Sequence, residues 1–276
     1  MTREDAPGPQ RVLSADCERC VGLCCVAPLF VKSAEFAFDK FAGDPCPNLA
    51  ADNRCGIHAR LRASGFPGCV TYDCFGAGQR VSSELLPGAD WRADAGTAAA
   101  LFTAFDVVRP LHELLWYLEA ALALDAALPL AAHLRTACAE TDALAGRAGS
   151  PGGPGRPEVD AHRGGVAALL RAASVLARAP YAATALDRRG ADLVEADLRT
   201  HDLRGADLRG AEMLGADLRG LDLDLADLTG ADLRAADLRG TDLGGALFVT
   251  GSQLESATGD PRTRIPRHLA RPAHWG

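Results

Sequence analysis

The sequence predicts a mixed fold: a metal-tied, cysteine-rich and α-helical N-terminal domain, followed by a C-terminal solenoid of short strands. Two observations carry this prediction. Residues 191–250 repeat the tripeptide Ala-Asp-Leu with a period of five, which fits neither an α-helix nor a long strand. Eight of the nine cysteines lie between Cys17 and Cys74, in a stretch without a long periodic apolar run.

Each five-residue unit of the repeat combines an extended segment with a turn. Ala and Leu flank an Asp, which is the alternation of a short strand, and the Arg-Gly that often follows allows the chain to turn. Such units stack when the chain winds as a solenoid, with Ala and Leu inside and Asp in water. Its open ends need helical caps, which we expect over residues 166–185 and 251–276.

Residues Ala191–Thr250 resemble the pentapeptide-repeat family, with units such as Ala206-Asp207-Leu208 and Ala226-Asp227-Leu228. The resemblance implies a right-handed quadrilateral β-helix with four units in each coil. The twelve units would then form about three coils, with a height of about 15 Å.

Amino-acid composition divides the rest of the chain into four regions. Residues 1–16 are polar and contain proline, so we expect a flexible arm. Residues 17–90 form the cysteine-rich region, and apolar stripes at three- and four-residue spacing predict helices packed on it over residues 91–145. Residues 146–165 are rich in glycine and proline, which predicts a linker.

The spacing of the cysteines indicates metal binding. The Cys17-x2-Cys20 pair lets two thiolates meet one ion from a single turn. Eight sulfurs could form two four-thiolate sites or one site with spare thiols, or they could hold an iron–sulfur cluster. The cofactor is therefore zinc or iron, since thiolates suit both. Redox pairs and inert buried thiols are the alternatives, and the isolated Cys138 is expected to fill a helical core. The candidate metal ligands are Cys17, Cys20, Cys24, Cys25, Cys46, Cys55, Cys69 and Cys74.

The same region resembles the zinc- or iron-chelating cysteine-cluster (YkgJ-like) family. The resemblance covers residues 17–75 and rests on Cys17-x2-Cys20-x3-Cys24-Cys25 together with Cys46-Pro47 and the segment Arg54-Cys55-Gly56-Ile57-His58. It implies a metal or iron–sulfur centre among these cysteines. His58 replaces a tyrosine of the family and is a candidate additional ligand, or a group that supports one. Cys74 lies outside the general motif.

Charge and hydropathy limit the cellular locations and the classes of binding partner that we expect. The net charge of −7 belongs to the repeat, where residues 191–245 include thirteen acidic and six basic side chains. The sequence has no basic stripe, so direct nucleic-acid binding is not expected. It shows neither an apolar signal core nor an apolar run long enough for a membrane span, which predicts a cytoplasmic protein without membrane contact.

The favoured function is a metal-binding pentapeptide-repeat protein whose acidic solenoid face contacts an unknown protein partner. One alternative is a DNA mimic that modulates a DNA-binding enzyme such as gyrase. Another is an iron-dependent redox or peptide-modifying enzyme. The sequence contains no nucleophile elbow, phosphate-binding loop or zinc-hydrolase pattern, so no catalytic residue is assigned and an enzyme is not favoured.

Overall fold

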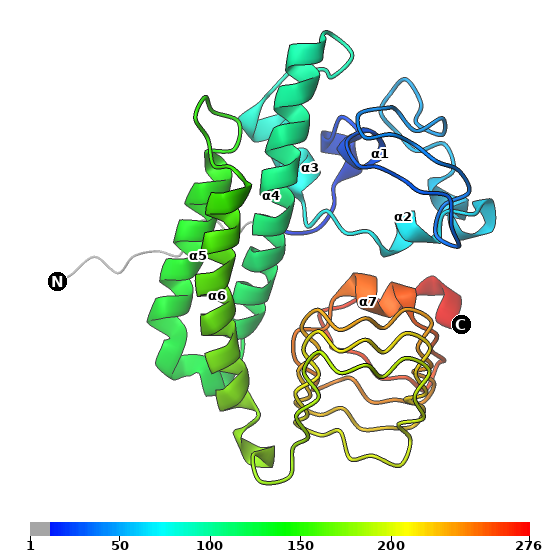
Figure 1. Cartoon of the computed structure of the whole chain (residues 1–276), viewed down its shortest axis with the longest axis vertical. Helices are drawn as coiled ribbons and strands as arrows, with labels where there is room; N and C mark the ends of the chain where they lie inside the picture. Colours follow the sequence, from blue (N-terminus) through cyan, green and yellow to red (C-terminus); the bar gives the residue numbers. More distant parts are fainter. Residues whose placement is uncertain (1–11) are drawn as a thin grey trace, which may run out of the picture.

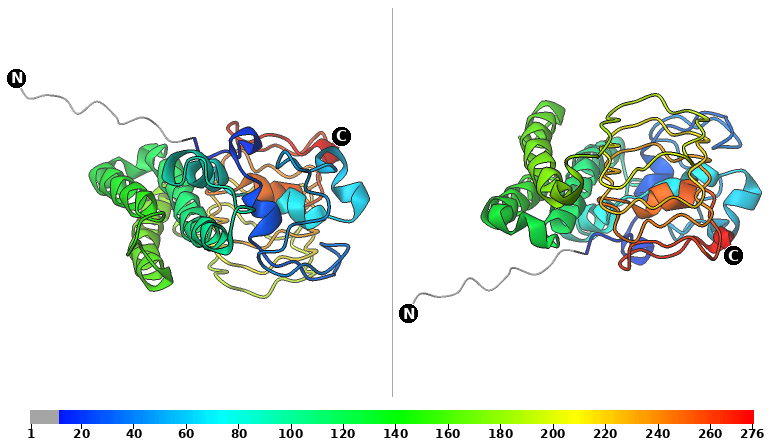
Figure 2. Two further views of the ribbon diagram at one scale, coloured as in Figure 1. Left: turned by 90° about the horizontal axis from the view of Figure 1, so that it is seen from above. Right: turned by 90° about the horizontal axis from the view of Figure 1, so that it is seen from below.

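A computed structural model describes residues 12–276 of the chain. Figure 1 shows three parts that pack together: a cysteine-rich region of short helices and loops, a bundle of three long helices, and a coiled repeat region. In both views of Figure 2 the bundle lies beside the coils. Most of the arm expected over residues 1–16 lies outside the described residues.

The cysteine-rich region is made of single helical turns joined by loops. Two antiparallel bridges, Phe30–Lys40 and Leu49–Cys55, close its loops. Its helical segments are η1 (Cys17–Arg19), α1 (Leu23–Val26), η2 (His58–Arg60), η3 (Arg62–Ser64), α2 (Pro67–Thr71), α3 (Ala77–Arg80) and the π-helical η4 (Val81–Leu85).

The bundle consists of α4 (Ala95–Leu122), α5 (Ala131–Gly146) and α6 (Arg156–Ala177), with η5 (Asp125–Leu130) between the first two. Asp94 caps α4, because its Oδ1 accepts hydrogen bonds from the backbone N–H groups of Gly96 and Thr97 at 2.8 and 2.9 Å. The connection predicted over residues 146–165 is shorter than expected, since α6 already begins at Arg156.

No single helix in the described part of the chain has the length and apolar character needed to cross a membrane. The bent pair of α4 and residues Asp125–Gly146, at 111°, meets that test by length and composition alone.

The repeat region winds with twenty residues per coil. Parallel bridges join Asp192 to Glu212 and Glu212 to Asp232, and similar bridges extend the coils from Asp187 to Arg264. In most units the fifth residue turns the chain with a positive φ, as in Gly205 at 64°.

The predicted β-helix is wrong in its secondary structure, because residues 12–276 contain no β-strand. Regular structure in this part of the chain is helical, and the β-pairing between neighbouring coils consists of isolated bridges. The physical reason lies in the short repeat. In most units a single residue pairs with the next coil before the chain turns, so no ladder extends along a side.

The interior of the coils follows the predicted alternation. The Ala and Leu of successive units are buried, and Ala216, Leu218 and Leu228 are fully inaccessible. Asp207 and Asp227 depart from the expected exposure because the bundle covers their side of the coils. The Ser174 hydroxyl donates to Asp227 at 2.5 Å, and Arg178 forms an ion pair with Asp207 at 3.3 Å. The C-terminal part of α6 thus lies along the side of the coils.

The last coil carries a short helix, α7 (Gly251–Ser256), at the end that faces the cysteine-rich region (Figure 1). A capping box between Thr250 and Gln253 begins this helix. Helix α7 packs against α2, and Arg62 pairs with Glu255 at 3.0 Å. The chain then ends in η7 (Ala273–Trp275), whose buried Trp275 donates to the carbonyl of Ala257 at 3.1 Å.

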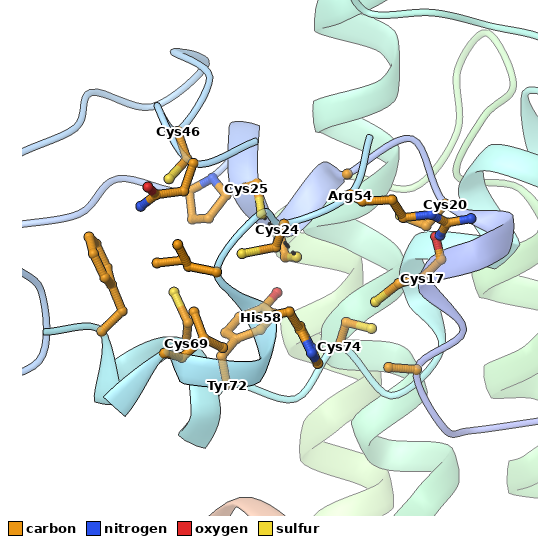
Figure 3. A pocket seen from close by; sticks show the side chains of 18 of the residues that line it. Cys17, Cys20, Cys24, Cys25, Cys46, Arg54, His58, Cys69, Tyr72 and Cys74 are labelled. Carbon is orange, nitrogen blue, oxygen red and sulfur yellow. Dashed lines mark hydrogen bonds between the residues drawn. The ribbon is translucent and has the colours of Figure 1, made fainter. Parts of the chain in front are cut away.

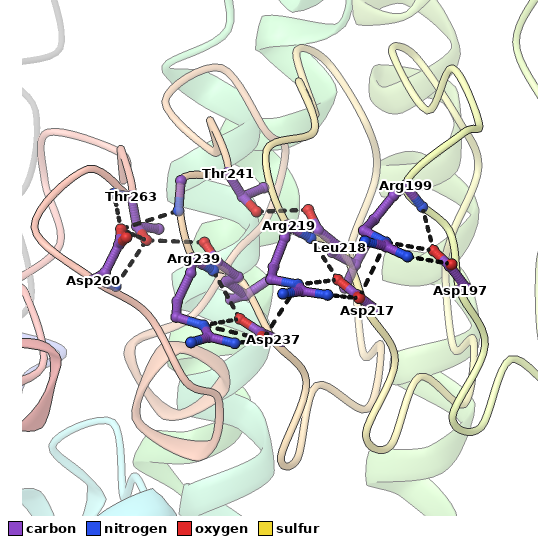
Figure 4. A network of polar contacts seen from close by, with 12 residues as sticks. Asp197, Arg199, Asp217, Leu218, Arg219, Asp237, Arg239, Thr241, Asp260 and Thr263 are labelled. Carbon is purple, nitrogen blue, oxygen red and sulfur yellow. Dashed lines mark hydrogen bonds and ion pairs between the residues drawn. The ribbon is translucent and has the colours of Figure 1, made fainter.

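Arginine and aspartate alternate along one column of the coils (Figure 4). Arg199 contacts Asp197 of its own unit at 2.7 Å and Asp217 of the next coil at 3.2 Å. The column continues through Asp217, Arg219, Asp237 and Arg239. These pairs are solvent-exposed, so each contributes little stability, but together they neutralise a column of carboxylates.

We expect Leu218→Asp to destabilise the coils by about 4 kcal/mol, because it places a carboxylate in the packed interior. The matched control is Leu214→Asp, at a position whose side chain is 39% exposed. Thermal unfolding followed by circular dichroism measures both. Equal melting temperatures for the two variants would contradict the assignment of the inward-facing positions.

We also expect the carboxyl group of Asp202 to titrate with a low pKa. Hydrogen bonds from the side chain and backbone of Arg204 lower its pKa to about 2. A carboxyl group whose pKa is lowered by folding stabilises the protein above its unfolded pKa of about 3.9, and this contribution is lost as the pH falls from about 4 to 2. NMR titration of the carboxyl carbon measures the pKa, which should return toward 4 in Arg204→Gln. An unchanged pKa in that variant would show that the arginine is not the cause.

Candidate metal centre

Helix α1 turns two adjacent cysteines toward one cavity. Gly22, with φ at 77°, lets the chain bend into this helix. Leu23 and Val26 are fully buried on the opposite side, so Cys24 and Cys25 between them remain free to face the cavity. Their sulfur atoms lie 4.0 Å apart.

The other cysteines reach the same cavity from separate short segments. Cys17 and Cys20 lie at the two ends of η1, and Cys69 lies within α2. Cys46 is tied to α1 because its backbone N–H donates to the carbonyl of Cys25 at 2.9 Å. Cys55 pairs with Leu49 in an antiparallel bridge.

The cavity has a volume of about 480 Å³ and is lined by all eight candidate cysteines (Figure 3). Its apolar wall includes Phe30, Phe66 and Leu61. His58 also lines the cavity, and its exposed side chain places it near solvent. The ninth cysteine, Cys138, lies instead against the core of the bundle.

The donor set suits a thiolate-bound metal centre, because eight free thiols face one cavity with apolar walls. Within residues 12–276, however, no group of three or more Cys, His, Asp or Glu side chains is placed so that it could hold an ion. Metal binding would therefore require these thiols to move closer together.

Burial raises the pKa of several of these thiols. It raises the pKa of Cys69 to about 12 and also raises the pKa values of Cys17, Cys55 and Cys74. Cys25 differs from these four. The hydrogen bond from the thiol of Cys24 lowers its pKa, and the charge of Lys40 acts in the same direction. A metal cation would replace the thiol protons on binding.

Lys40 is a buried cation beside this cavity that the sequence analysis did not identify. Its side chain is only 5% exposed, and its Nζ donates to the carbonyls of Val26, Phe41 and Asp44 at 2.9, 3.0 and 2.9 Å. Burial lowers the pKa of Lys40, whereas the nearby Cys46 raises it. The available signal was its rarity, since the chain has only two lysines.

A buried polar network fixes the bend that carries Cys74. Phe75 follows it with φ at 48°, and the Phe75 carbonyl accepts a hydrogen bond from Nδ1 of His112 at 2.6 Å. The other ring nitrogen, Nε2, accepts from Arg80 at 3.1 Å, and Arg80 also donates to Asp142 at 2.7 Å. The sequence analysis missed this role, because it searched for histidines only as parts of metal sites.

The comparisons with known proteins first identify the repeat. Residues 189–224 and 211–248 match the family of pentapeptide repeats (eight copies). These two segments coincide with the coils described above.

A second comparison extends over nearly the whole chain. The sequence is 52% identical over 266 residues to the uncharacterized protein YybG of Bacillus subtilis (strain 168), covering 95% of both chains. The chain belongs to the YybG family. This match extends over the cysteine-rich region, the bundle and the coils. It assigns no activity, and the resemblance of residues 17–75 to the YkgJ-like family stays a prediction.

Solved structures resemble the chain only in part. A pentapeptide repeat protein from the Arabidopsis thaliana thylakoid lumen is 31% identical, with a TM-score of 0.23, and covers 32% of this chain and 55% of its own. The pentapeptide repeat protein Rfr23 from the cyanobacterium Cyanothece 51142 is 29% identical, with a TM-score of 0.17, and covers 29% of this chain and 63% of its own.

We expect Gly78→Ala to disturb the cysteine-rich region, because a Cβ at this position would lie 2.7 Å from the sulfur of Cys20. Such overpacking should lower the free energy of unfolding by about 1–3 kcal/mol. The matched control is Gly164→Ala in α6, where a Cβ meets nothing within 4 Å and should stabilise the helix by up to about 1 kcal/mol. Denaturant unfolding measures both variants. A stabilised Gly78→Ala protein would contradict the contact between Cys20 and α3.

Proposed function

We propose that the protein binds a metal centre, either zinc or an iron–sulfur cluster, through the eight cysteines of its N-terminal region. The observation that carries this proposal is the convergence of all eight on one cavity, although they come from segments up to 57 residues apart. A cytosolic protein that needed only apolar packing would have no reason to place eight thiols together.

The local structure would allow the cysteine side chains to move when a metal binds. The cysteines lie on single helical turns and loops, and none of the helical segments that carry them is longer than five residues. Short segments can shift by the small distances that separate a thiol-lined cavity from a closed coordination shell. Bound zinc would supply a structural cross-link, whereas an iron–sulfur cluster would add electron transfer.

In this proposal the coiled repeat region supports the metal-binding region and offers a surface to a protein partner. Helix α7 on the last coil packs against α2, which carries Cys69. The bundle covers a second side of the coils through contacts such as Ser174–Asp227. The acidic faces that remain exposed are the surface available to a partner. The alternation of arginine with aspartate in Figure 4 gives less support to DNA mimicry, which requires a strongly negative surface.

We expect full-length protein purified without air to contain zinc or iron in stoichiometric amounts. In Cys20→Ser the metal content should fall and the region over residues 17–90 should lose stability, while the coils remain folded. Elemental analysis and an absorbance spectrum measure the metal, and limited proteolysis measures the folding of each part. Cys138→Ser is the matched control and should retain the full metal content, since Cys138 lies in the bundle. If wild-type protein bound neither zinc nor iron after reconstitution, the proposal would be contradicted.

A further inference from the structure

The adjacent cysteines of α1 cannot easily serve one ion. Consecutive residues of a helix are rotated by about 100° from each other, whereas two ligands of a tetrahedral zinc ion must both approach within about 2.3 Å of it. In Figure 3, Cys46 and Cys69 lie on one side of the Cys24–Cys25 pair, and Cys17, Cys20 and Cys74 lie on the other. The pair therefore separates the remaining ligands into two groups.

The first group lies beside the bundle. Cys20, Cys24 and Cys74 all pack against one apolar cluster that includes Leu23 and Val81 and extends to α4. Cys20 and Cys74 both lie near the start of α3. The sulfur of Cys20 lies against Gly78, and the backbone carbonyl of Cys74 accepts a hydrogen bond from the N–H of Ala77 at 2.9 Å.

Cys17 completes this group from η1. This segment packs against α3, and the backbone N–H of Cys20 donates to the carbonyl of Cys17 at 3.4 Å. Two hydrogen-bonding contacts fix the position of Cys17. Asp16 caps η1, and the Arg54 guanidinium donates to the carbonyl of Cys17.

The second group lies away from the bundle. The backbone of Cys46 is hydrogen-bonded to Cys25 at 2.9 Å, and its carbonyl accepts from the N–H of Leu49 at 2.9 Å. Leu49 in turn pairs with Cys55. None of these three cysteines packs against the apolar cluster that holds the first group.

Cys69 joins the second group from α2. In Figure 3, Cys69 lies on the same side of the Cys24–Cys25 pair as Cys46, whereas Cys74 lies on the other side.

We propose that the cysteines form two four-thiolate sites that meet at the Cys24–Cys25 peptide. Site 1 comprises Cys17, Cys20, Cys24 and Cys74, and site 2 comprises Cys25, Cys46, Cys55 and Cys69. This inference rests on the proposed metal-binding function and adds its stoichiometry and its ligand assignment. The buried Lys40 donates to the carbonyl of Val26, the residue that follows Cys25 of site 2.

The test uses full-length apoprotein titrated with Co²⁺, whose thiolate charge-transfer and ligand-field absorbance reports four-thiolate coordination. Wild-type protein should bind two equivalents per chain. Cys24→Ser and Cys25→Ser should each lose one four-thiolate centre, although the two residues are neighbours on one helical turn. Cys20→Ser/Cys24→Ser should keep one centre because both changes fall in site 1. Cys24→Ser/Cys25→Ser should lose both.

Three outcomes separate the inference from the function on which it depends. One equivalent in wild-type protein, removed equally by Cys20→Ser and Cys69→Ser, would overturn the two-site assignment while metal binding stands. Two equivalents that are both lost in Cys20→Ser/Cys24→Ser, with the helical circular dichroism unchanged, would overturn the ligand assignment. No binding to wild-type protein of Co²⁺, or of iron and sulfide after reconstitution, would overturn the proposed function itself. The wild-type stoichiometry decides the number of sites even where a variant fails to fold.

Discussion

Left-handed backbone at the fifth residue of most units sets the shape of the repeat, on which the other two parts depend. Glu195, Leu225 and Ala235 adopt this conformation at positions where most units have glycine, so the chain accepts a steric cost to keep the turn regular. The regular turn brings the buried Ala and Leu of each coil above those of the previous one. It also places Phe248 against Tyr117 of the bundle and α7 against α2. The same backbone constraint thus packs the coils and positions the surfaces that hold the molecule together.

The cysteine-rich region is irregular where the coils are regular. Few of its residues belong to secondary-structure elements longer than one turn. Its apolar contacts are shared with α4, through Leu23, Ala77 and Val81 on one side and Leu101 and Phe105 on the other. The part of this region that lies farther from the bundle, around Cys46 and Cys55, relies on loop hydrogen bonds and on Lys40. Bound metal would therefore contribute most to stability where the apolar core contributes least.

Much of this arrangement could be predicted from local patterns in the sequence. The period of five identified the interior positions of the coils, and the clustering of cysteines identified residues that the fold brings to one cavity. The predicted strands were wrong because alternation over three residues does not require a ladder. The start of α6 was missed because Pro157 lies within a segment rich in glycine and proline, yet proline also suits the first turn of a helix. The pairing of His112 with Arg80 and Phe75 joins residues far apart in sequence, and no spacing rule could have revealed it.

The coils are held at one side by α6 and at one end by α2, and this double attachment changes what the repeat number means. In a free rod, units can be gained or lost with little effect on the units that remain. Here, one added five-residue unit would rotate α7 by a quarter of a coil and carry Glu255 away from Arg62. A full coil of twenty residues would restore the rotation but lift α7 by about 4.8 Å. The length of the repeat is therefore a fixed dimension of the molecule, matched to the distance between the base of the bundle and the cysteine-rich region.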